Sequence, residues 1–253
     1  TMPASPLVPK LKPPRFQGAR IIMALILREM SATYGASAGG YIWAVLQPVG
    51  FLIMLSFGFS LMVRTPSLGT SFFLFYASGY LPFAFYGDMA TKIARSIIYA
   101  QALLAYPSVT WIDTVLSRFI LHTITMGLVT FLVISGSLLL ISDRTIIQLA
   151  PVLIAMMLAA LTGLGIGLMN ATLGGLFPIW ENLWKIVTRP LFLASGIFYT
   201  YEDLPSLAQD LLWWNPLFHI TGLMRTGFYP NYHASYVSLP YTFGVAMISI
   251  TLG

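Results

Sequence analysis

Long apolar stretches dominate this chain of 253 residues. A helix needs about 20 mostly apolar residues to cross the hydrocarbon core of a bilayer, and about six stretches come close to that length. Charged residues make up only 8% of the chain, too few to cover the surface of a soluble fold of this size. We therefore predict an all-α, polytopic membrane protein with six transmembrane helices. The predicted spans are 41–63, 72–91, 114–141, 146–174, 183–199 and 241–253.

The first 40 residues contain a shorter apolar stretch, 21–27, between Arg20 and Arg28. Its seven residues are too few to cross a membrane. At 100° per residue, Arg20, Arg28 and Ser31 fall on one arc of a helix, and mostly apolar residues fill the rest. This pattern favours an amphipathic helix lying on the membrane surface, with an extension of the first span as the alternative.

The basic residues indicate the orientation of the chain. If the N-terminus is cytoplasmic, ten of the thirteen Lys and Arg residues lie inside, and Arg64, Arg144 and Arg225 lie outside. The positive-inside rule therefore predicts a cytoplasmic N-terminus. It also explains the net charge of +5 without nucleic-acid binding. Because the last predicted span has only 13 residues, we expect the natural chain to continue as a basic cytoplasmic tail.

Two connections between spans are longer than simple turns. The cytoplasmic stretch 92–113 mixes polar and aromatic residues, and could present a short helix to a soluble partner. The external stretch 201–240 contains short apolar pieces, 211–214 and 217–224, which cannot cross the membrane. Short re-entrant helices would keep their backbone groups hydrogen-bonded. We predict a single permease domain over 1–253, with the six-span region beginning at residue 41.

The sequence lacks the residues or motifs that thiol catalysis, ATP hydrolysis and metal catalysis require. The chain has no cysteine and no G-x-x-x-x-G-K-[ST] motif, and its three histidines lack metal-ligand spacing. Adjacent carboxylates occur at Glu202 and Asp203, where a solvated turn before Pro205 is favoured over a hydrolytic pair. A membrane-bound enzyme acting on lipids, with this pair or His219, is the alternative. We predict that the chain is not an enzyme and binds no metal or cofactor.

The middles of the predicted spans lack Asp, Glu, Lys and Arg, and His122 is the nearest exception. Ion-coupled carriers usually place ionisable residues there, so this alternative class is disfavoured. Gly163-x-x-x-Gly167 lies within the fourth predicted span, and this motif is typical of helices that pack closely in lipid.

Five segments together resemble one transporter family. Leu-Arg-Glu-Met at 27–30 and Leu-Gln-Pro at 46–48 are similar to the N-terminal part of ABC transporter type-2 permeases. Leu-Ala-Tyr-Pro at 104–107 resembles the cytoplasmic loop that follows the second span in these permeases. Asn-Pro-Leu-Phe-His at 215–219 resembles their external segment between the last two spans. The stretch 229–241, rich in tyrosine, resembles the capsular polysaccharide export permeases of Gram-negative bacteria.

This resemblance implies a six-helix permease of the bacterial inner membrane, which forms a homodimer and binds two copies of a separate ATPase. ATP and Mg would then be bound by the ATPase and not by this chain. The resemblance also implies export of lipid-linked capsular polysaccharide, with periplasmic and outer-membrane proteins as further partners. A permease for O-antigen or teichoic acid precursors is the alternative within the same superfamily.

Aromatic residues make up 14% of the chain and provide candidates for the substrate path. An aromatic face can stack on a sugar ring without a fixed register along a polymer. The alternative is that these side chains only pack against neighbouring helices. The candidates on the second predicted span and at the external end of the fifth are Tyr76, Tyr80, Phe83, Phe198, Tyr199 and Tyr201.

Cytoplasmic segments that combine aromatic, apolar and charged residues are typical of partner surfaces and are the candidates for contact with the ATPase. For Arg20 and Arg28, contact with lipid headgroups is the alternative. The candidate residues are Arg20, Arg28, Glu29, Arg95, Tyr99, Leu104, Tyr106 and Pro107.

Overall fold

The computed structural model describes residues 17–34, 39–101, 109–140 and 147–253, and these form helices and turns without strands. The all-α prediction is therefore confirmed for the described residues. The helices are α1 (Gln17–Tyr34), α2 (Gly40–Ser60), α3 (Phe72–Ala94), α4 (Ser96–Ala100), α5 (Trp111–Leu140), α6 (Leu149–Leu176), α7 (Trp180–Leu193), α8 (Ser206–Leu212), α9 (Pro216–Phe228) and α10 (Leu239–Leu252).

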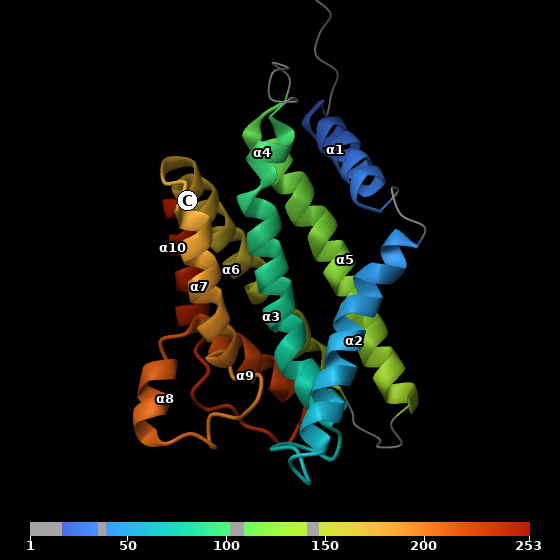
Figure 1. Ribbon diagram of the computed structural model, residues 1–253, viewed down its shortest axis with the longest axis vertical. Helices are drawn as coiled ribbons and strands as arrows, with labels where there is room; N and C mark the ends of the chain where they lie inside the picture. The colour runs from blue at the N-terminus through green and yellow to red at the C-terminus, as the bar shows by residue number, and fades with distance from the viewer. Residues whose placement is uncertain (1–16, 35–38, 102–108, 141–146) are drawn as a thin grey trace, which may run out of the picture.

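The helices α2, α3, α5, α6, α7 and α10 run along the long axis of the molecule in alternating directions (Figure 1). Helices α1 and α4 lie at one end, which we call the α1 end, and the C-terminus lies near it. Helices α8 and α9 lie toward the opposite end, the α9 end. The six long-axis helices correspond in order to the six predicted spans.

Among the described residues, three helical stretches are long and apolar enough to cross a membrane: Ile42–Ser60, Trp111–Leu139 and Leu149–Leu176. Helix α3 has 23 residues but carries Asp88 and Lys92, and α10 has 14 residues. Length and composition thus support three candidate spans, and six spans stay a prediction. The membrane-surface position of α1 and the re-entrant position of α8 and α9 stay predictions too, although each of these segments is helical.

The fifth predicted span, 183–199, is helical only as far as Leu193. The chain then turns at Gly196, whose φ of 70° is unfavourable for residues with a side chain. Side chains satisfy carbonyl groups at the end of the helix: Asn215 Nδ2 donates to Ala194 at 2.9 Å, and the Tyr199 hydroxyl donates to Leu193 at 2.7 Å. This ending places Tyr199 in the turn after the helix and not within a span.

Helix α6 packs between α3 and α10, and its glycines explain the close approach. A Cβ atom at Gly163 would lie 2.8 Å from the backbone oxygen of Tyr86 on α3. On the other side of α6, a Cβ atom at Gly165 would lie 3.0 Å from the backbone oxygen of Ala246 on α10. A Cβ atom at Gly167 would lie 2.9 Å from the backbone oxygen of Ala90, again on α3. None of these positions has room for a side chain, so the close-packing role predicted for Gly163-x-x-x-Gly167 is confirmed.

Candidate functional site

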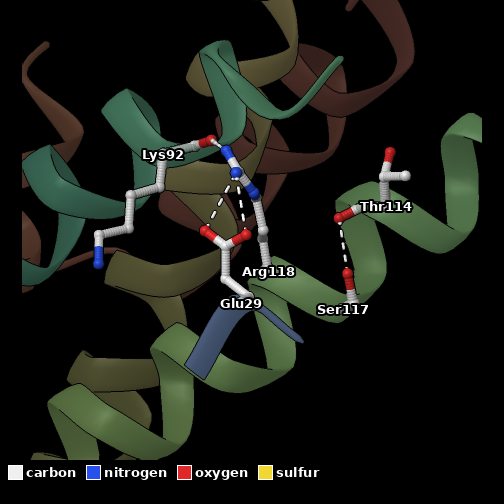
Figure 2. Close-up of polar contacts among 5 residues, drawn as sticks. All are labelled: Glu29, Lys92, Thr114, Ser117 and Arg118. Carbon is white, nitrogen blue, oxygen red and sulfur yellow. Dashed lines mark hydrogen bonds and ion pairs between the residues drawn. The ribbon is translucent and has the colours of Figure 1, made fainter. Parts of the chain in front are cut away.

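Arg118 on α5 connects α5 to the N-terminal helix (Figure 2). Its Nη2 atom lies 3.0 Å from Oε1 and 3.1 Å from Oε2 of Glu29 on α1. The Arg118 side chain is only 10% exposed, so solvent screens this ion pair less than an ordinary surface pair. The contact joins helices that are separated by the whole of α2, α3 and α4 in the chain.

The same guanidinium also holds the end of α3. Arg118 Nη1 donates to the backbone carbonyl of Lys92 at 3.0 Å. This carbonyl lies in the last turn of α3, where carbonyl groups lack partners within the helix. A cation in that position is also favoured by the helix dipole. Arg118 lies 5.0 Å from the ring centroid of Tyr99 on α4, within the range of a cation–π contact.

The hydroxyl groups near Arg118 are bonded within α5. Ser117 Oγ donates to the Thr114 carbonyl at 2.9 Å (Figure 2). Thr114 Oγ1 donates to the Trp111 carbonyl at 2.7 Å. These two hydroxyl groups therefore do not bond to Glu29, whose carboxylate contacts Arg118. We call Arg118, Glu29, Tyr99 and the Lys92 carbonyl the Arg118 junction; it links α1, α3, α4 and α5.

The predicted ATPase-contact residues are partly assembled by this junction. Glu29 and Tyr99 meet at Arg118, whereas Arg95 lies 4.0 Å from Glu181 at the start of α7. Arg20 and Arg28 are exposed on α1. The predicted residues Leu104, Tyr106 and Pro107 lie outside the described residues.

Arg118 itself was absent from the predicted contact residues. The sequence did contain a signal for it, because Arg118 is the single Arg or Lys in the predicted span 114–141.

Four of the six predicted path residues lie close together between α2, α3 and α7. Tyr76 is only 3% exposed, and its ring centroid lies 6.2 Å from that of Phe198. Phe59 of α2 packs between them, at 5.3 Å from Tyr76 and 5.4 Å from Phe198. Tyr80 packs on Phe51 at 4.5 Å. Tyr76 thus belongs to the packed interior of this chain.

Tyr80 and Phe83 also line a cavity of about 660 Å³ between α2, α3, α5 and α7. The cavity begins beside Gly40, the first residue of α2, and reaches toward the middle of the bundle. Its wall therefore contains the two most accessible of the predicted path residues on α3.

Tyr199 and Tyr201 are separated from this cluster and lie in the turn between α7 and α8. The ring of Tyr201 stacks on Tyr236 with centroids 4.2 Å apart. The Tyr199 carbonyl accepts a hydrogen bond of 2.6 Å from Arg225 Nη1, and Arg225 Nη2 donates to Ile197 at 3.1 Å. The structure thus divides the predicted path residues into a cluster within the bundle and a pair at the α9 end.

The carboxylates of Glu202 and Asp203 have different partners. Asp203 accepts hydrogen bonds of 2.9 Å from both the backbone N–H and the hydroxyl of Thr200. The Tyr232 hydroxyl donates to Glu202 at 3.1 Å. Burial by itself raises the pKa of Asp203, but the hydrogen bonds from Thr200 and Ser67 and the charge of Arg225 outweigh it, so the pKa lies below its ordinary value. Asp203 therefore closes a turn, as an ionised acceptor.

No cluster of three or more potential metal ligands occurs within the described ranges. The predicted site residues that the structure brings together either form contacts between helices, as at the Arg118 junction, or line the cavity beside Tyr80 and Phe83.

The sequence matches the model of a membrane protein family, described as ABC-2 type transporter, over residues 20–229. It is 28% identical to the polysialic acid transport protein KpsM of Escherichia coli over 232 residues, covering 92% of this chain and 90% of KpsM. It is 26% identical to the capsule polysaccharide export inner-membrane protein CtrC of Neisseria meningitidis serogroup B, covering 91% of this chain and 90% of CtrC. Identity to the capsule polysaccharide export inner-membrane protein BexB of Haemophilus influenzae is 25%, covering 87% and 83% of the two chains.

Proposed function

Because this chain belongs to the ABC-2 type transporter family, we propose that it is the membrane subunit of an ABC exporter for capsular polysaccharide. The observation that carries this proposal is the similarity to KpsM, which extends over 92% of this chain and 90% of KpsM. Relatives named for capsule export in two further species favour the same substrate class over O-antigen or teichoic acid precursors.

The energy for transport is proposed to come from a separate ATPase. The chain contains no P-loop motif with which to bind ATP. In this proposal the ATPase, with its ATP and Mg, binds at the α1 end. Supporting this, Arg20, Arg28, Lys92, Arg95 and Arg118 all lie on helices or helix ends there, as expected for the cytoplasmic side.

The Arg118 junction is the proposed route by which movement of the ATPase reaches the bundle. One side chain contacts α1, α3 and α4, so displacement of either short helix at the α1 end also acts on α3 and α5. Helix α3 carries Tyr80 and Phe83, and a shift of α3 would therefore move the proposed substrate path.

The polymer path itself is proposed to lie between two copies of this chain. Exposed apolar side chains on α2, including Phe57, and the absence of buried residues on α7 leave these helices free to face a second copy. Periplasmic and outer-membrane export proteins would continue the route beyond the α9 end.

Deletion of the gene in its native host, followed by complementation, tests the proposed function. We expect the deletion strain to lose surface polysaccharide and to retain polymer inside the cell, and the purified chain to bring an ATPase with it. Surface polysaccharide that is unchanged by the deletion would contradict the proposal.

A further inference from the structure

The cavity between α2, α3, α5 and α7 contains polar groups that the fold itself does not use. Its polar wall includes Gln47 of α2, Asp88 and Lys92 of α3, and His122 of α5. Ionisable groups within a membrane protein are costly and are therefore usually retained for a function.

His122 provides the clearest sign of a missing partner. The residue is only 4% exposed, and both of its ring nitrogens are buried without a hydrogen-bond partner. An unsatisfied buried donor or acceptor costs about 1–3 kcal/mol, so such groups normally have partners. Its nearest ring contact is with Phe85, at 5.8 Å between centroids, and this contact uses neither nitrogen as a hydrogen-bonding group.

The charged side chains of the cavity, Asp88 and Lys92, likewise form no ion pair within 4.0 Å among the described residues. Two ion pairs occur in the described part of the chain, Arg95–Glu181 and Arg118–Glu29, and neither includes Asp88 or Lys92. Asp88 and Lys92 lie one helical turn apart on α3 and face the same cavity. Together they supply a carboxylate acceptor and an ammonium donor without a large net charge.

Aromatic faces complete the wall of the cavity. Trp43 of α2 and Tyr80 and Phe83 of α3 line the same space as the polar groups. Trp43 is 61% exposed in this chain, so its ring remains available to a ligand. A pyranose ring has apolar C–H faces and a rim of hydroxyl groups, and its binding calls for aromatic faces combined with hydrogen-bonding side chains.

The volume and the lining residues of the cavity disfavour two other roles, proton transfer and binding of a lipid acyl chain. A proton relay requires only a chain of ionisable groups, so it does not account for an aromatic-lined space of about 660 Å³. An acyl chain would leave Asp88, Lys92 and His122 unsatisfied, at the cost given above.

We propose that this cavity is a sugar-recognition site, which binds one pyranose unit of the polymer on the α1 side of the bundle. His122 and Asp88 hydrogen-bond its hydroxyl groups, Lys92 donates to a hydroxyl or carboxylate oxygen, and Trp43 and Tyr80 pack on its faces. This inference rests on the proposed function, because it assigns that function a place where the polymer is first recognised.

The test uses the full chain in lipid nanodiscs with two soluble probes, a sialic acid tetramer and maltotetraose. Saturation-transfer difference NMR detects weak binding of such oligosaccharides. We expect transfer to at least one probe, and about tenfold weaker binding in Asp88→Asn and in His122→Asn. The first substitution replaces an acceptor oxygen by a donor, and the second shortens the side chain and removes the ring Nε2. Matched controls are Asp210→Asn on α8 and His233→Asn, both exposed and outside the cavity; these should bind like the original chain.

A second measurement separates binding from folding. Because His122 has no hydrogen-bond partner in the chain, His122→Asn loses only packing such as the ring contact with Phe85, so it should lower the melting temperature slightly while it weakens sugar binding about tenfold. A lower melting temperature with unchanged sugar binding would show that His122 serves packing, and would overturn the inference. Absence of transfer from both probes to the original chain would overturn it as well.

The inference and the proposed function fail in different experiments. Unchanged binding in both site variants contradicts the sugar-recognition site alone. Surface polysaccharide that survives deletion of the gene contradicts the proposed function, whatever the binding measurement gives.

Discussion

Nη2 of Arg118 lies 3.0 Å from Oε1 of Glu29, and this ion pair fixes α1 against α5 at the α1 end of the bundle. The two residues are 89 positions apart in the chain. Since the same guanidinium donates to the Lys92 carbonyl at 3.0 Å, loss of Arg118 leaves unsatisfied groups on two other helices. The arrangement makes Arg118 a positioning residue for the elements proposed to meet the ATPase.

Arg118→Gln is expected to lower the free energy of unfolding by about 1–3 kcal/mol, because the Glu29 carboxylate and the Lys92 carbonyl lose their partner. Glu29→Gln should cost less, since its side chain is 32% exposed. Unfolding of the single and double variants in detergent measures the coupling between them. Effects of the two substitutions that simply add would show that the ion pair contributes nothing.

Tyr99→Asp is expected to reduce copurification of the ATPase and, with it, export. Tyr99 is 61% exposed at the α1 end, and a new charge there would have to be buried in the complex. The matched control is Leu207→Asp on α8, also exposed but at the opposite end, and it should leave ATPase copurification unchanged. Equal recovery of ATPase with both variants would place the contact elsewhere. The same experiment with Tyr106→Asp extends the test to the predicted contact residues outside the described ranges.

Tyr80→Ala and Tyr76→Ala are expected to differ, although the residues lie one turn apart on α3. Tyr80 lines the cavity, so its loss should reduce surface polysaccharide while protein level and ATPase copurification are kept. Tyr76 is 3% exposed, and its truncation should destabilise the chain by about 3 kcal/mol and lower export together with protein level. Tyr199→Ala should behave like Tyr80→Ala if the path continues to the α9 end.

The path assignment for Tyr80 and Tyr199 depends on export normalised to the amount of membrane-inserted protein. If both alanine variants lose export only in proportion to lost protein, these side chains serve packing and the assignment is wrong.

Gly163→Ala is expected to destabilise the bundle by about 1–3 kcal/mol, because its new methyl group would lie 2.8 Å from the backbone oxygen of Tyr86. Gly174→Ala on the same helix is the control: no atom lies within 4 Å of the added Cβ, and alanine favours the helix. Thermal unfolding in detergent compares the two. Equal stability of both variants would contradict the close packing of α6 on α3.

Acid is expected to loosen the turn closed by Asp203. The pKa of this carboxyl is lowered in the folded chain, so the ionised form stabilises the turn above the ordinary pKa of about 4. This contribution is lost as the pH falls below about 4 and through the lower, folded-state value. Proteolysis of the 200–205 segment should therefore increase at low pH with an acid-active protease. Asp203→Asn should be cleaved with less dependence on pH, and an unaltered pH profile in this variant would exclude the carboxylate as the cause.

The sequence alone determined the protein class and the positions of its long helices, because apolar composition and helical periodicity are local properties. Long apolar stretches and a content of only 8% charged residues exclude a soluble fold. Glycines four residues apart identify a closely packed face of a helix, even when the helix that packs on this face is unknown. The motifs at 27–30, 104–107 and 215–219 likewise indicated the family without any knowledge of tertiary contacts.

Only the tertiary structure decided which distant residues meet. It paired Arg118 with Glu29, and it placed the side chains of Tyr199 and Asn215 on the carbonyl groups where α7 ends. It also placed Tyr76 in the interior but Tyr80 at a cavity wall. It also left His122 without a partner beside Asp88 and Lys92. Periodicity gives the face of a helix on which a residue lies, but the neighbour of that face depends on how the helices cross, and this is fixed by packing over the whole bundle.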